Sequence, residues 1–273
     1  MRAKDKGDRM ALDHWQSYHE KWSRLRPPLR PDADVVEAFR TAVGAGIHTA
    51  LLLGVTPELA DIAPDLIAID SSQPMIDHIW PGNTARRRAR RGDWYALDFV
   101  DGSFDAALGD GVLTFPHYPD RTRVLLREIR RVLRPGGRFV CRLFAAPEDA
   151  EPLERLRDDA FRGAIGNFHA LKWHVAMALV RASGEPNIAV ERIRDTVMHL
   201  FPDRDALARS TGWARADIDT IDVYDGSAEV YAFPTRAQYL AISRDEFATV
   251  HFIEAGRYPL AERCPLLVLE ARR

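Results

Sequence analysis

Asp70 and the residues after it are of the types that bind a nucleoside. Asp70 directly follows the apolar run 66–69, and its two carboxylate oxygens could accept hydrogen bonds from both hydroxyls of a ribose. Met75 follows at a spacing that would let its side chain pack on a flat base. Aspartate also caps helices and methionine is common in cores, so neither residue is conclusive alone.

Two more acidic residues stand beside residues that could contact a ligand. Asp93 could accept a hydrogen bond from an exocyclic amine, and the N–H of Trp94 could donate to a ring nitrogen. Gly109 and Asp110 follow an apolar run, where a bare backbone can line a ligand. Ordinary turns explain both pairs equally well, so their meaning depends on the elements around them.

Those elements are predicted to be parallel strands separated by helices. Short continuous apolar runs are typical of strands that are buried on both faces. They occupy 48–54, 66–70, 104–109 and 138–143, and helical patterns occupy 74–80 and 121–133. The fold class that we expect is α/β, a doubly wound, mostly parallel Rossmann-like sheet. In such sheets ligands bind beyond the carboxyl ends of the strands, which would bring the acidic residues together.

The rest of the chain divides around this core. We expect an N-terminal helical segment (1–46) with a helix starting at Asp32, a ligand-binding core (47–146), an inserted lid (147–242) and closing strands (243–273). Within the lid, helices are expected over 151–160, 168–182 and 200–211, and two strands within 219–233. The closing strands are expected over 247–253 and 266–271.

Composition excludes several classes of protein. The chain has 273 residues, 46% of them hydrophobic, and a net charge of −2, which does not suit bulk binding to nucleic acid or to an anionic membrane. Two cysteines cannot build a disulfide framework, and the nine histidines show no metal-binding spacing, so no metal is expected. With no apolar run that would span a membrane and no signal peptide, a cytoplasmic location is expected.

The order and spacing of the motifs strongly resemble the class I S-adenosylmethionine-dependent methyltransferases. The likeness covers about 49–143 and rests on four segments: Asp70-Ser71-Ser72-Gln73-Pro74-Met75-Ile76, Gly92-Asp93-Trp94, Asp101-Gly102-Ser103-Phe104-Asp105 and Arg131-Val132-Leu133-Arg134-Pro135-Gly136-Gly137. A weaker likeness at 264–269 matches the family's last strand. The resemblance implies S-adenosylmethionine as cofactor and S-adenosylhomocysteine as product. Asp70 would hold the ribose, Asp93 and Trp94 the adenine edge, Met75 an adenine face, and Gly109 and Asp110 the methionine end.

The first loop departs from the family's pattern of an acid followed by three glycines. Leu52 replaces the acid, Gly54 is the first glycine, and Thr56 and Glu58 replace the other two. The short spacing to Asp70 predicts that the first helix is trimmed, with Thr56 as its cap. Asp110 or Tyr18 could then hold the cofactor's amino group. The predicted cofactor-binding residues are therefore Tyr18, Gly54, Thr56, Asp70, Ser71, Met75, Asp93, Trp94 and Gly109.

Methyl transfer to a small molecule is the function that these features favour. Asp110 and His117 are the candidate catalytic bases by position, and aromatic residues of the lid, such as Trp173 and Tyr231, suit an apolar acceptor. Two alternatives remain. The altered loop could hold the cofactor without catalysis, or the arginine run 86–91 could bind RNA, although such runs are more often a solvated loop or helix face. No oligomeric state is indicated.

Overall fold

The computed structural model of the protein describes residues 19–273 and is built around one seven-stranded sheet. The strand order is β3-β2-β1-β4-β5-β9-β8, and the first five strands in this order are parallel, whereas β9 runs antiparallel to both of its neighbours. The strands are β1 (Thr49–Leu53), β2 (Asp65–Asp70), β3 (Arg87–Arg91), β4 (Phe104–Asp110), β5 (Leu133–Arg142), β8 (Thr249–Ile253) and β9 (Leu266–Glu270). The expected doubly wound, mostly parallel fold is confirmed.

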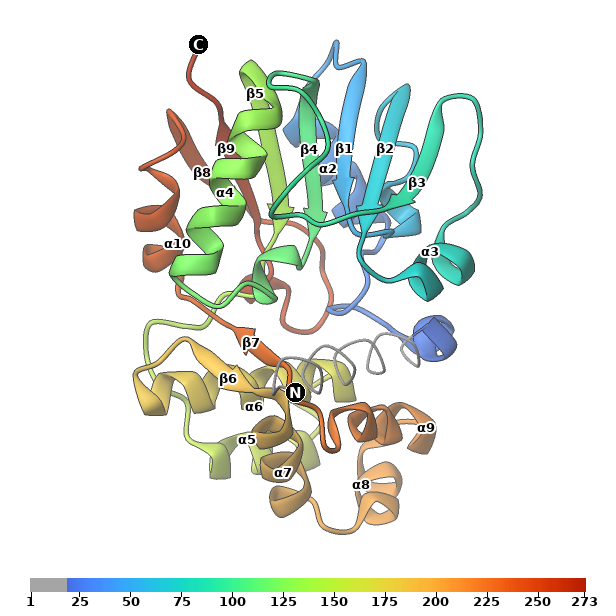
Figure 1. Ribbon diagram of the computed structural model, residues 1–273. Helices are drawn as coiled ribbons and strands as arrows, with labels where there is room; N and C mark the ends of the chain where they lie inside the picture. The colour runs from blue at the N-terminus through green and yellow to red at the C-terminus, as the bar shows by residue number, and fades with distance from the viewer. Residues whose placement is uncertain (1–18) are drawn as a thin grey trace, which may run out of the picture.

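Helices cover both faces of the sheet because its strands are apolar on both sides. Along β1, Ala50 and Leu52 pack into one hydrophobic cluster and Leu51 and Leu53 into another. The first cluster is covered by α2 (Ala33–Val43), η2 (Pro57–Leu59) and α3 (Gln73–Ile79), the second by α4 (Asp120–Val132) and α10 (Arg236–Ser243). Figure 1 shows α4 in front of the sheet and α2 behind it. As expected, Asp32 caps α2, and its Oδ1 accepts a hydrogen bond from the Val35 N–H at 2.9 Å.

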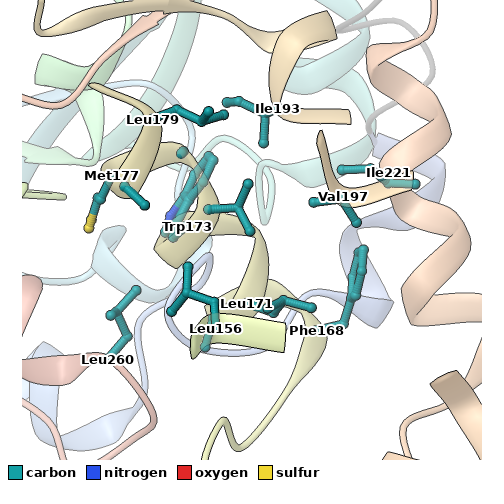
Figure 2. Packing of buried hydrophobic residues seen from close by; sticks show 14 of the residues in the cluster. Leu156, Phe168, Leu171, Trp173, Met177, Leu179, Ile193, Val197, Ile221 and Leu260 are labelled. Carbon is teal, nitrogen blue, oxygen red and sulfur yellow. The ribbon is translucent and has the colours of Figure 1, made fainter. Parts of the chain in front are cut away.

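Residues 147–234 form a separate unit beyond the carboxyl ends of the strands, below the sheet in Figure 1. It contains α5 (Leu153–Phe161), α6 (Phe168–Ser183), α7 (Val190–Leu200), α8 (Arg204–Thr211), α9 (Arg215–Ile218) and η4 (Asp219–Tyr224), with a two-stranded sheet of β6 (Asn187–Ala189) and β7 (Val230–Ala232). Figure 2 shows its apolar core, in which Trp173 and Leu171 of α6 pack among residues of α5 and α7. The remaining described elements are η1 (His19–Arg24), η3 (Val112–Thr114) and η5 (Ala261–Arg263).

The chain leaves the core and returns to it at adjacent points. Ala146 forms an isolated parallel bridge with Thr235, and its N–H donates to the carbonyl of Pro234 at 3.1 Å. The next helix, α10, already packs on the sheet through Tyr239 and Ile242. The inserted unit therefore ends near Pro234 rather than at Ile242.

Three expectations about individual elements are wrong. The arginine run is neither a loop nor a helix but the edge strand β3. The segment 219–233 holds a 3₁₀-helix and a single strand, whose partner β6 lies earlier in the chain. The helix expected over 200–211 begins only at Arg204, because Leu200 ends α7, a helix that the sequence reading missed.

Candidate functional site

A cavity of about 270 Å³ lies between the carboxyl ends of the strands and the inserted unit. Strand order reverses between β1 and β4, which is where open α/β sheets bind ligands. Seven of the predicted cofactor-binding residues line this cavity: Gly54, Thr56, Asp70, Ser71, Met75, Asp93 and Trp94. The fold thus brings together most of a site that the sequence spreads over four loops.

Asp70 ends β2 and stands in the wall of the cavity. Its Oδ1 accepts a hydrogen bond from the backbone N–H of Ser72 at 2.8 Å, and the backbone of Ser71 also bonds to the carboxylate. Burial outweighs these bonds and raises the pKa of Asp70 to about 6. At neutral pH the group is still mainly ionised, so it can accept hydrogen bonds from two hydroxyls.

Gly54 provides bare backbone directly opposite Asp70. Its φ is +84°, and a Cβ built there would come within 3.9 Å of both Asp70 Oδ2 and Trp94 Cζ2. A side chain at this position would therefore project into the space beside the carboxylate. The connection to β2 is reduced to the short 3₁₀-helix η2, which confirms the trimmed first helix.

Thr56 lines the cavity but does not cap η2 through its side chain. It occupies the N-cap position of η2, but its side chain accepts no hydrogen bond from the helix. Glu58, which replaces the third glycine of the family's loop, forms an ion pair with Arg30. The ion pair thus connects the altered loop to the segment before α2. Trp22 and Leu29 of that segment also line the cavity.

Met75 and Trp94 both contribute apolar side chains to the lining of this cavity. Met75 is 4% exposed and follows the Ser72 cap of α3. The Trp94 indole Nε1 donates to the carbonyl of Ile69 at 2.7 Å, so only the backbone N–H of Trp94 is left to meet a ring nitrogen. The Oδ1 of Asp93 accepts a hydrogen bond from the Tyr95 N–H at 2.9 Å.

Asp110 lines the cavity but is held in a buried ion pair. Arg142, the last residue of β5, is fully buried and donates to the two Asp110 oxygens at 2.5 and 2.9 Å. A third guanidinium N–H donates to the Tyr258 hydroxyl at 3.0 Å. A carboxylate whose charge is compensated in this way is better placed to fix the ends of β4 and β5 than to take a proton from a substrate.

Two other predicted site residues do not line the cavity. His117 is exposed, in the turn before α4, and does not line the cavity, so it is not placed to act as the base. Gly109 does not line the cavity, and a Cβ there would lie 2.4 Å from the Val112 side chain, so the glycine allows close packing at this point. Gly111, with φ +70°, lines the cavity in its place. Tyr18 lies outside the described residues.

The inserted unit supplies an aromatic wall at the other end of the cavity. Trp173 of α6 packs against Phe144 and Tyr231, with ring centroids 5.3 and 6.0 Å apart. Phe115 bridges this group to the nucleoside end, 5.5 Å from Tyr231 and 6.2 Å from Trp94. The cavity is therefore continuous from Asp70 to an apolar chamber lined by Phe115, Phe144, Trp173 and Tyr231.

Sequence reasoning missed one polar residue of this wall, Glu229. It precedes β7, and its carbonyl accepts a hydrogen bond from the Val190 N–H at 3.0 Å. Burial raises the pKa of its carboxyl above the ordinary value. Its position two residues before Tyr231 could have indicated it, because residues i and i+2 of an extended chain face the same side.

A buried lysine lies behind the aromatic wall. Lys172 is 1% exposed, and its Nζ lies 5.0 Å from the Trp173 ring and 4.7 Å from the Tyr224 ring. Burial, with a smaller contribution from Lys21, lowers the pKa of Lys172 to about 7. The neighbouring His169 is also buried, which lowers its pKa to about 3, as suits a structural histidine.

Residues 19–273 contain no group of three histidine, cysteine or acidic side chains that could hold a metal ion. Within the same residues no helix is long and apolar enough to cross a lipid bilayer.

The chemistry of the cavity fits S-adenosylmethionine. It offers a carboxylate for the ribose at Asp70, apolar faces for adenine at Met75 and Trp94, and bare backbone at Gly54. The fold is a Rossmann-like methyltransferase architecture, and the chemistry of the cavity suits a nucleoside. Residues 42–141 match the family model of the methyltransferase domain.

Known relatives agree with this class. A ubiquinone/menaquinone biosynthesis C-methyltransferase UbiE of Nitrobacter hamburgensis is 30% identical over 58% of this chain and 59% of its own length. A demethylmenaquinone methyltransferase of Symbiobacterium thermophilum is 28% identical over 76% of this chain and 78% of its own. This chain thus spans less than two thirds of the length of the first of these relatives.

A solved structure shows the same fold. The N-methyltransferase NodS of Bradyrhizobium japonicum, in complex with S-adenosylhomocysteine, superposes with a TM-score of 0.53 at 12% identity, over 96% of this chain and 97% of that one. The model of the methyltransferase domain thus matches residues 42–141, and the fold over nearly the whole chain is that of this methyltransferase.

Proposed function

We propose that the protein transfers a methyl group from S-adenosylmethionine to a small, largely apolar acceptor. The acceptor binds between the carboxyl ends of the strands and the inserted unit. The observation that carries this proposal is the continuity of one cavity from Asp70 at the nucleoside end to Trp173 and Tyr231 at the other. The names of the curated relatives favour an aromatic ring of the quinone or hydroquinone type as the acceptor.

The chain contributes mainly binding and alignment to this reaction. When bound, S-adenosylmethionine supplies an activated methyl group. Asp70 and Gly54 fix the nucleoside, and the aromatic wall orients a flat acceptor and excludes water from the contact between them. Holding two reactants in line can supply roughly 7–11 kcal/mol of the barrier.

Calorimetric titration with S-adenosylhomocysteine tests the cofactor part of the proposal. Asp70→Ala should weaken binding by about 1.5–3 kcal/mol, the range for hydrogen bonds to a charged group. Asp77→Ala is the matched control, because Asp77 is exposed on α3 and bonds only to Gln73 among the described residues. Unchanged affinity in a folded Asp70→Ala variant would show that the cofactor lies elsewhere.

Product analysis tests the catalytic part. The protein, incubated with S-adenosylmethionine and a panel of hydroquinones, phenols and aromatic amines, should release S-adenosylhomocysteine together with a singly methylated product. Cofactor binding without release of S-adenosylhomocysteine from any acceptor would favour the non-catalytic alternative. A cytoplasmic location belongs to the same proposal, and fractionation of cells that express the chain tests it.

A further inference from the structure

The end of the cavity that we propose for the acceptor is lined mainly by apolar side chains, but it also contains buried polar atoms. Trp173 and Thr114 line the cavity and are 3% and 2% exposed. Neither the Trp173 Nε1 nor the Thr114 Oγ1 has a hydrogen-bond partner within residues 19–273. Leaving a buried polar group unpaired is costly, so these two atoms point to a ligand that carries polar groups of its own.

Glu229 is the carboxylate of this end that has no compensating charge. Unlike Asp110, which Arg142 holds, its carboxylate has no hydrogen bond or ion pair with any residue that the structure describes, and burial is the sole cause of its raised pKa. Its backbone is fixed, because the N–H donates to Ser227 Oγ at 3.3 Å and the carbonyl accepts from Val190. The side chain is therefore held in the wall by its backbone while its oxygens remain open to a ligand.

We infer that Glu229 is the proton acceptor of this enzyme, and that the methyl acceptor is an aromatic molecule bearing a hydroxyl group that Glu229 deprotonates. This inference rests on the proposed function. An aromatic frame matches the rings of Trp173, Tyr231 and Phe115, which line the same chamber. A carboxylate that burial has made more basic is also better matched to a weakly acidic hydroxyl.

The step balances without another reactant. The O–H bond of the acceptor breaks, the proton goes to a Glu229 oxygen, and the electron pair stays on the acceptor oxygen. That oxygen bonds to the methyl carbon as the carbon–sulfur bond breaks, and the bonding pair of that bond remains on sulfur. The positive charge of the sulfonium and the negative charge of Glu229 disappear together, and Glu229 then returns its proton to water.

Binding of a hydroxyarene and of its methyl ether tests the inference without relying on turnover. Calorimetry on the protein saturated with S-adenosylhomocysteine would compare 2-naphthol with 2-methoxynaphthalene. The wild type should bind 2-naphthol about 10- to 100-fold more tightly, because only the naphthol can donate to a carboxylate. Glu229→Gln should reduce this preference by about tenfold, and Glu191→Gln, which changes an exposed carboxylate of the same unit, should keep it.

The outcomes separate the inference from the proposed function. Equal binding of the two probes by the wild type, or an unchanged preference in Glu229→Gln, would overturn the role of Glu229. Failure of the wild type to bind S-adenosylhomocysteine would instead overturn the proposed function. With the acceptor identified by product analysis, Glu229→Gln should lower kcat by about 10²–10⁴-fold, and an unchanged kcat would also refute the inference.

Discussion

Asp70, Asp110 and Glu229 line one cavity, and their surroundings give the three carboxylates different tasks. Asp70 accepts backbone N–H bonds and lines the end of the cavity that we propose for the ribose. Asp110 is neutralised by Arg142, while Glu229 has no such partner among the described residues. Residue type alone could not separate these roles, because the separation comes from groups that are distant in the sequence.

The raised pKa of Asp70 predicts how cofactor affinity depends on pH. Only the ionised carboxylate accepts both ribose hydroxyls, so protons compete with the cofactor below a pKa of about 6. Affinity for S-adenosylhomocysteine should be constant between pH 7 and 8 and fall by up to about tenfold per pH unit below 6. Calorimetry from pH 5 to 8 measures this slope. In Asp70→Asn binding should be weaker and the slope lost, and the same slope in that variant would contradict the assignment.

Lys172 predicts a pH-dependent gain in stability on substitution. Its pKa is lowered from 10.5 to about 7, so between these values the unfolded chain holds a proton that the folded protein has released. The free energy of unfolding therefore rises with pH across this window, and the cost of burying the charge is complete below pH 7. Lys172→Met should stabilise the protein by about 1–4 kcal/mol at pH 6 and by less at pH 9. Urea unfolding at both values measures this, and a gain that does not change with pH would refute it.

At the scale of elements, the turns after β1 and β2 position the proposed nucleoside site by different means. After β1 the chain relies on the left-handed backbone of Gly54 and a single 3₁₀ turn. After β2 it relies on Ser72, whose Oγ accepts from the Met75 N–H and so caps α3. Because the cap holds Met75 in the cavity wall, it links the stability of this helix to the shape of the site.

This difference predicts unequal effects of two similar substitutions. Ser72→Ala removes a helix cap and should lower the free energy of unfolding by about 0.5–2 kcal/mol. Thr56→Ala removes no capping bond and should lower it by less than about 0.5 kcal/mol. Urea denaturation of both variants decides the comparison. A larger loss for Thr56→Ala would show that its hydroxyl has a partner after all.

The elements that the sequence predicted are those with apolar patterns of their own. Burial leaves a recognisable pattern of apolar residues in β1, β2, β4 and α4. The strands contain continuous apolar runs, and the helix has apolar residues at helical spacing. The arginine strand β3 has no such pattern because it lies at the edge, where its side chains meet solvent. The Asp110–Arg142 pair was not predictable, since it depends on the register between β4 and β5. His117 is close to Asp110 in the sequence, but the chain turns through η3 between them and leaves His117 exposed.

At the scale of the whole molecule, β3 forms one exposed edge of the sheet. Among the described strands it pairs with β2 alone, and it consists of five consecutive residues, Arg87-Arg88-Ala89-Arg90-Arg91. Several of these arginines are already engaged within the protein: Arg87 with Asp61 at 2.6 Å, and Arg91 with the Ser71 carbonyl at 3.0 Å. Charged side chains on an edge strand hinder pairing with another chain, which is a sufficient reason for the run.

We therefore predict that the run does not bind RNA. A variant with serine at Arg86, Arg87 and Arg88 should keep its affinity for S-adenosylhomocysteine within about twofold and lose at most about 1 kcal/mol of stability through the exposed Arg87 pair. Arg91→Ser is the contrasting variant, since it frees Ser71 in the cavity wall and should weaken cofactor binding. RNA binding by the wild type that falls steeply with salt and disappears in the triple variant would contradict the prediction.

The adjacency of Ala146 and Thr235 makes the inserted unit an exchangeable module. Residues 147–233 contribute no strand to the seven-stranded sheet. The residues that flank them, Ala146 and Pro234, are joined by a backbone hydrogen bond. A different segment could be joined at the same two points without altering the strand order or the loops that line the cavity at the ends of β1 and β2. Under the proposed function, recombination at this junction would change which acceptor is methylated, in a single genetic event, and leave the methyl donor the same.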